Sequence, residues 1–115
     1  MTTTTLPTAW PVEPVEVLTR VIQLLSRCAD LGLRPGADSN LTLGLGADLA
    51  AKRARALIAD VAVHPSEDPA VLAETDQVVL LLAAEELIRQ PIELFPPGMS
   101  QVMVAVLDLI RETVP

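Results

Sequence analysis

The sequence is poor in aromatic and chemically reactive side chains. It has no tyrosine, and Trp10, Phe95, Cys28 and His64 are each the single residue of their type. One cysteine excludes an internal disulfide, a zinc site with several thiolates and a CxxC redox pair, and it fits a reducing, cytoplasmic setting. One histidine excludes a di-iron helical bundle, which needs two Glu-x-x-His pairs. We therefore predict a protein that is not an enzyme and holds neither a cofactor nor a metal.

Long apolar runs are also missing. The longest run, Val78–Ala84, is much shorter than the roughly 18 residues that a membrane span requires. Residues 1–11 contain threonine and proline but no basic residue, so this stretch does not predict a signal peptide. We expect a soluble protein without a membrane partner.

Aliphatic residues dominate what is present. The chain has 115 residues and 50% of them are hydrophobic, which is enough for one packed core and excludes an acidic disordered chain. A core of Leu, Val, Ile and Ala suits helices packed on helices. We predict an all-α fold, a small four-helix bundle over residues 13–115, preceded by an extended Thr/Pro-rich arm over residues 1–12.

Apolar residues recur at steps of three and four in the first half of the domain, which predicts two helices. The first begins at Pro14 and ends at Gly32, for which we expect a left-handed C-terminal stop. Residues 33–46 contain several glycines and prolines and predict a loop, with a hinge at Gly44–Gly46. The second helix is expected from Ala47 to just before Pro65, with His64 in its last turn.

The second half predicts two further helical regions. Asp68 followed by Pro69 is typical of a helix start, and the pattern continues to Gln90 as one long helix or as a short helix followed by a longer one. Val78–Ala84 has no polar face, so we expect it to form the central helix, covered on every side. Ser100 is expected to cap the last helix.

The last helix is more apolar than a peripheral helix requires. Val102–Leu107 is apolar on all faces, and the first helix has a second apolar stripe, formed by Val17, Leu24 and Leu31. Such a surplus predicts burial between subunits. We expect a homodimer or a higher homo-oligomer, with contacts from Val102, Val106 and Ile110. Trp10, in the arm, is expected to anchor it in a groove of a neighbouring subunit.

Charge is unevenly distributed along the chain. Residues 1–57 carry six basic and five acidic side chains, whereas residues 58–115 carry two basic and ten acidic ones. The acidic half disfavours nucleic acid. Lys52, Arg53 and Arg55 form the basic cluster, which suits an acidic protein surface, such as the acidic half of a neighbouring copy. We predict a helical protein–protein interaction module, such as an assembly factor, an adaptor or a structural subunit. The alternative is a small nucleic-acid-binding regulator that uses these three cations.

Other candidate groups have simpler structural interpretations. Asp60 and His64 are spaced to share a metal or a proton, but an imidazole is also favoured by the dipole at a helix end. Ser39 is similar to the attachment serine of acyl carrier proteins, although Asn40 replaces the usual aliphatic residue, and we interpret its segment as a turn. Cys28 is expected to pack as a small apolar group with a raised pKa.

Two adjacent carboxylates lie on the third helical region. Glu85 and Glu86 are neighbours in sequence, so their side chains point about 100° apart and cannot share a substrate. We expect Glu85 to pair with Arg89, four residues later.

Overall fold

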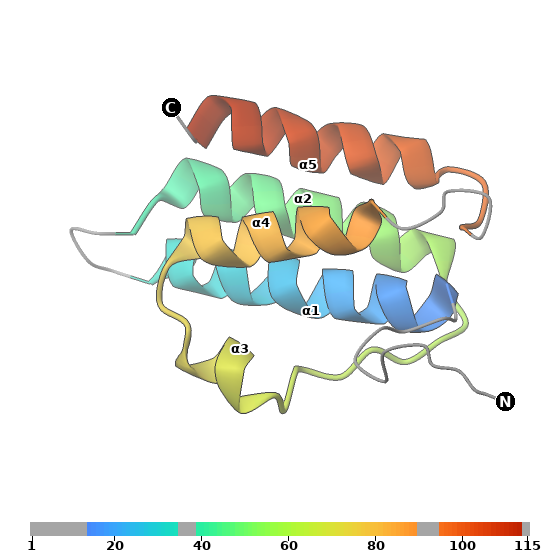
Figure 1. Cartoon of the computed structure of the whole chain (residues 1–115), viewed down its shortest axis with the longest axis horizontal. Helices are drawn as coiled ribbons and strands as arrows, with labels where there is room; N and C mark the ends of the chain where they lie inside the picture. Colours follow the sequence, from blue (N-terminus) through green and yellow to red (C-terminus); the bar gives the residue numbers. More distant parts are fainter. Residues whose placement is uncertain (1–13, 35–38, 90–94, 114–115) are drawn as a thin grey trace, which may run out of the picture.

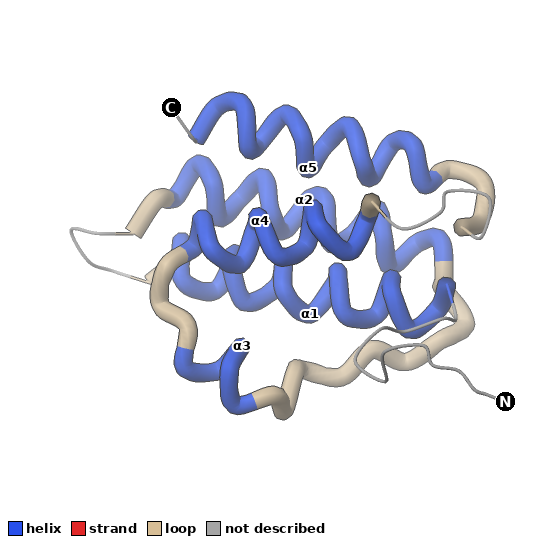
Figure 2. Tube along the Cα trace, viewed as in Figure 1, coloured by secondary structure: helices blue, strands red, loops and turns tan. Residues whose placement is uncertain are grey.

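The chain folds into a bundle of helices (Figure 1). The computed structural model describes residues 14–34, 39–89 and 95–113, and these residues contain helices and connecting segments but no strand (Figure 2). The helices are α1 (Pro14–Leu33), α2 (Leu41–Leu57), α3 (Pro69–Ala73), α4 (Gln77–Ile88) and α5 (Met99–Thr113). The all-α prediction is confirmed, with one short helix beyond the four expected. The predicted arm over residues 1–12, with Trp10, lies outside the described residues.

The four longer helices occupy the corners of a square. α1 packs against α2 and α4, and α5 packs against the other sides of the same two helices. α1 and α5 are therefore diagonal to one another, as are α2 and α4. Following the colours of Figure 1, every neighbouring pair runs antiparallel, while α2 and α4 run in the same direction. The reason is the long crossover of residues 58–76, which contains α3 and returns the chain to the end at which α2 began.

The core is built mainly on α1, which has more buried residues than any other helix. Leu18, Ile22 and Leu25 are fully buried, and they belong to one core together with small residues of α2, such as Ala50 and Ala54, and larger residues of α4 and α5. The prediction that Val78–Ala84 forms the central, fully covered helix is wrong. α4 lies at a corner of the bundle, and its Val79 and Leu82 are 46% and 40% exposed.

A contact between two glycines sets the spacing of α1 and α2. A Cβ added at Gly44 would lie 2.9 Å from the Cα of Gly32, and a Cβ at Gly32 would lie 2.7 Å from the Cα of Gly44. Gly32 is buried within α1 and is not a left-handed stop, and Gly44 is inside α2 rather than in a hinge. Both predictions were wrong for one reason: these glycines allow two helices to approach closely instead of ending them.

α2 begins and ends earlier than expected. Asn40 caps its first turn, because its side-chain oxygen accepts a hydrogen bond from the backbone N–H of Leu43 at 3.0 Å. The helix ends at Leu57, where the backbone of Ile58 leaves the helical conformation and its side chain turns into the core. His64 is therefore not in a helix, and the predicted loop over residues 33–46 is shorter than expected.

The third helical region consists of two helices, one of the two arrangements that the sequence allowed. Asp68 caps α3 and Pro69 begins it, as predicted. The carboxylate of Glu74 then accepts hydrogen bonds from the backbone N–H groups of Thr75 and Asp76, which interrupts the helix, and Asp76 caps α4. α5 begins at Met99, one residue before the expected cap.

Candidate interaction surfaces

The predicted basic cluster lies at the C-terminal end of α2. Lys52, Arg53 and Arg55 are all exposed. Lys52 forms an ion pair of 3.0 Å with Asp48, one turn earlier in the same helix. Within α2 these three cations and Asp48 leave a net charge of +2. The cluster is thus a basic end of one helix rather than a continuous basic surface.

The apolar residues that the sequence assigned to a subunit interface are mostly inside the chain. Val102 and Val106 are buried in the core, where α5 packs against α2 and α4, and Ile110 is partly buried beside them. The second stripe of α1 is also buried; it consists of Val17, Leu24 and Leu31. The assignment of Val102 and Val106 to a partner surface was therefore wrong, because the bundle itself buries their side of α5.

An exposed apolar stripe on α2 was missed. Leu41, Leu45 and Leu49 are each more than half exposed, and their spacing of four residues aligns them on the outer side of the helix. We call these three residues, together with Lys52 and Arg53, the leucine face. The four-residue repeat is visible in the sequence, but the glycines at 44 and 46 led us to interpret its first half as a loop.

A second exposed apolar surface extends over α4 and α5. Val79 and Leu82 lie on the outer side of α4, and Val104 and Leu107 of α5 are 55% and 38% exposed. A groove of about 250 Å³ separates the two helices beside Leu107. The charges of these helices are acidic on balance, with four carboxylates against one arginine. We call Val79, Leu82, Glu86, Val104 and Leu107 the α4–α5 face.

The pairing predicted within α4 is confirmed. Arg89 donates to the carboxylate of Glu85, one turn earlier. A similar pair joins Arg111 to Asp108 in α5 at 3.5 Å. Glu86 forms no ion pair in the described part of the chain, so it remains available as a carboxylate at the surface of α4.

A buried amide joins three helices at one end of the bundle. The side-chain N–H group of Gln77 donates to the carbonyl oxygens of Cys28 and Asn40 at 3.1 and 3.2 Å, and its oxygen accepts from the backbone N–H of Asn40 at 2.9 Å. This side chain fastens the start of α4 to the end of α1 and to the cap of α2. Its role is structural, because each of these three hydrogen bonds is made with a backbone group of the bundle.

The single thiol is packed beside this amide. Cys28 is fully buried, and burial raises the pKa of its thiol from the ordinary 9.0 to about 11, although a hydrogen bond with Gln77 opposes part of the increase. The prediction of a raised pKa is confirmed. A thiol that keeps its proton at neutral pH is a poor nucleophile.

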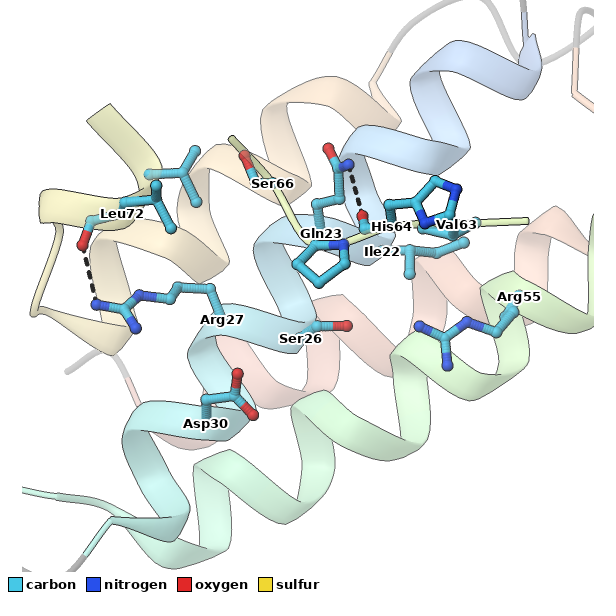
Figure 3. Close-up of a pocket in the computed structure, with 12 residues that line it drawn as sticks. Ile22, Gln23, Ser26, Arg27, Asp30, Arg55, Val63, His64, Ser66 and Leu72 are labelled. Atoms are coloured by element: carbon cyan, nitrogen blue, oxygen red, sulfur yellow. Dashed lines mark hydrogen bonds between the residues drawn. The ribbon is translucent and has the colours of Figure 1, made fainter. Parts of the chain in front are cut away.

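A cavity of about 190 Å³ lies between α1, the C-terminal part of α2 and the crossover (Figure 3). Its wall is apolar at Ile22 and Val63, and Asp30 and Arg55 lie at its edge. Arg27 reaches across from α1 and donates to the carbonyl oxygen of Leu72 at 3.0 Å. The cavity thus lies beneath the crossover, and Ser26, Ser66 and His64 also line it.

The remaining candidate groups lie in the connections between helices. Asp60 and His64 are both exposed, and the carbonyl of His64 accepts a hydrogen bond from the side chain of Gln23. The hydroxyl of Ser39 donates to the carbonyl of Arg34 at 2.9 Å. Within residues 14–34, 39–89 and 95–113, no three His, Cys, Asp or Glu side chains come close enough to hold a metal ion.

Comparisons of the chain with protein families, curated proteins and solved structures find no match. Among the described helices, none is both long enough and apolar enough to cross a membrane.

Proposed function

We propose that this chain is a non-catalytic helical interaction module that self-associates, and that it acts as an assembly factor, an adaptor or a structural subunit. The observation that carries the proposal is the grouping of exposed large apolar side chains on continuous helix faces. Scattered apolar residues are normal on a protein surface, whereas contiguous ones mark sites of association. Leu41, Leu45 and Leu49 follow one another at one-turn spacing on the exposed side of α2, and Val79 and Leu82 do so on α4.

The chemistry of the chain agrees with a role in binding. The one cysteine is buried and free, and the polar groups that are buried serve to join helices. A free thiol without a disulfide suits the reducing cytoplasm, which we propose as the site of action.

The test is the molar mass in solution, measured by light scattering over a dilution series of the full chain. Self-association predicts a mass above that of one chain, which falls as the protein is diluted. A constant monomer mass at every concentration would overturn the self-association.

A nucleic-acid-binding regulator is the second candidate, favoured by the three exposed cations within one turn of α2. It predicts that a fluorescent DNA or RNA duplex binds at low salt and is released as salt rises, because bound lysines and arginines displace counterions. Replacing Lys52, Arg53 and Arg55 by Glu would abolish that binding. If the duplex does not bind at low salt, or if binding survives the three replacements by Glu, this candidate is wrong.

A further inference from the structure

The two apolar faces lie on opposite sides of the molecule. α2 and α4 occupy diagonal corners of the bundle, and in Figure 1 α4 is in front while α2 is behind. The outward sides of these helices carry the leucine face and most of the α4–α5 face. Because the two faces point away from one another, one chain cannot bring them together. A second copy can contact either of them separately.

The faces match one another in the order of their residues. On α2, Leu45 and Leu49 come first and Lys52 follows seven residues after Leu45. On α4, Val79 and Leu82 come first and Glu86 follows seven residues after Val79. When the two helices are laid side by side in parallel, the apolar residues meet and Lys52 lies next to Glu86.

The topology of the bundle supplies this parallel orientation. α2 and α4 run in the same direction within each chain. A copy displaced sideways, with little rotation, therefore presents its α4 parallel to the α2 of its neighbour. No reversal of the molecule is required.

Pairing of two identical faces is less favourable than pairing of the two different faces. Two leucine faces in parallel would place Lys52 beside Lys52, and two α4 helices in parallel would place Glu86 beside Glu86. In antiparallel pairs the charged end of one helix would lie on the apolar end of the other. Like charges and buried unpaired charges are unfavourable at an interface, whereas opposite charges fix orientation.

We propose that the leucine face of one copy packs in parallel against the α4–α5 face of the next copy, with Lys52 beside Glu86. The contact is heterologous, because it joins two different faces. Each of two paired copies therefore keeps one face free for a further copy, and the assembly grows into a ring or an open chain rather than stopping at a symmetric dimer. This inference rests on the proposed self-association and specifies which surfaces carry it.

Two variants that each disable one face provide the test. The leucine-face variant is Leu45→Gln with Leu49→Gln, and the α4-face variant is Val79→Gln with Leu82→Gln. These side chains are exposed, glutamine is a good helix former, and the net charge does not change. Circular dichroism and urea unfolding of each variant establish that the bundle remains folded.

Sedimentation velocity on the wild type, on each variant and on their equal mixture distinguishes the arrangements. We expect wild-type species larger than a dimer, and monomers for each variant alone at the same concentration. The equal mixture should form a dimer and nothing larger, because it contains one intact pair of faces and no means of extending it. A mixture that stays monomeric overturns the proposed pairing.

Charge reversal gives an independent test that leaves every apolar group in place. Lys52→Glu or Glu86→Lys alone should weaken the association, and the chain with both changes should recover it. A wild type that stops at a dimer, with no recovery in the double variant, overturns the head-to-tail contact but leaves self-association intact. A wild type that is monomeric throughout overturns both.

Discussion

Gln77 shows, at the scale of one residue, how a buried polar group fixes the meeting of three helices. It is buried, and its amide makes three hydrogen bonds to backbone groups of Cys28 and Asn40. The sequence offered no sign of this role, because an amide beside a helix cap normally faces solvent. Its partners come from residues 37 and 49 positions away, and only the folded chain brings them together.

Replacing Gln77 by Leu should lower the free energy of unfolding by about 2–4 kcal/mol, because the backbone groups it now satisfies would be left buried without partners. Urea unfolding followed by circular dichroism measures the loss. Gln101→Leu, on the exposed side of α5, is the matched control and should change stability by less than about 0.5 kcal/mol. Equal effects at the two positions would show that the hydrogen bonds of Gln77 contribute little.

Cys28 should react slowly with alkylating reagents while the chain is folded. Raising the thiol pKa from 9.0 to about 11 lowers the thiolate fraction at pH 8 by about 100-fold, since the thiolate is the reactive form and each pKa unit is a factor of ten. We expect iodoacetamide to modify the native protein at least about 100-fold more slowly than the urea-unfolded chain, as followed by mass spectrometry. Similar rates in the two states would mean that the thiol is neither buried nor protonated.

At the scale of elements, α2 shows which part of the fold the sequence predicts and which part it does not. α1 was predicted from its apolar period alone, with Pro14 as its first residue, because its buried and exposed faces alternate in the ordinary way. The N-terminal turns of α2 were missed, because Gly44 and Gly46 are unfavourable in an isolated helix. Their contacts with α1 and α5 are tertiary and cannot be deduced from local preference.

The two glycines of α2 should respond differently to alanine. At Gly44 the new Cβ would meet backbone atoms of Gly32 and Ala29, which cannot move without separating α1 from α2, so we expect Gly44→Ala to destabilise the protein by about 1–3 kcal/mol. At Gly46 it would meet the end of the Leu109 side chain, which can rotate, and the gain in helix propensity is up to about 1 kcal/mol.

Thermal unfolding of the two alanine variants measures this difference. A lower melting temperature for Gly44→Ala, with little change or an increase for Gly46→Ala, is expected. If Gly44→Ala is as stable as the wild type, the helices are farther apart than the glycine contact implies.

The candidate surfaces illustrate the same division between local and tertiary information. The basic cluster of α2 was predicted because charge and period are local, and all three cations are exposed. The apolar surplus of α5 was recognised, but its assignment to Val102 and Val106 was wrong. The sequence shows that a helix is apolar all round; it does not show which sides the other helices cover.

At the scale of the whole molecule, the crossover of residues 58–76 determines the topology. A short connection after α2 would have made the next helix antiparallel to it, whereas the crossover returns the chain first and makes α4 parallel to α2. We call this crossover the strap. Two side chains of α1 hold it in place: Gln23 donates to the carbonyl of His64, and Arg27 donates to the carbonyls of Leu72 and Glu74. α3, within the strap, has no buried residue.

The strap should therefore open without unfolding of the bundle. Arg27→Met keeps most of the alkyl stem and removes the guanidinium that binds the last carbonyls of α3. We expect amide exchange at Val71 and Leu72 to accelerate by about tenfold or more, since a hydrogen bond to a charged group contributes roughly 1.5–3 kcal/mol. Exchange in the buried turns of α1 should stay the same, because few of the contacts of α1 involve the strap.

Hydrogen exchange measured by mass spectrometry on the wild type and on Arg27→Met separates local from global opening. Arg53→Met, which removes an exposed cation from α2, is the control and should leave the strap unaffected. If exchange accelerates equally in α1 and α3, the strap and the bundle unfold as one unit. If it accelerates only in α3, the packing of the four longer helices is stable without the contacts of the strap. The crossover then determines the direction of α4 but contributes little to the stability of the bundle.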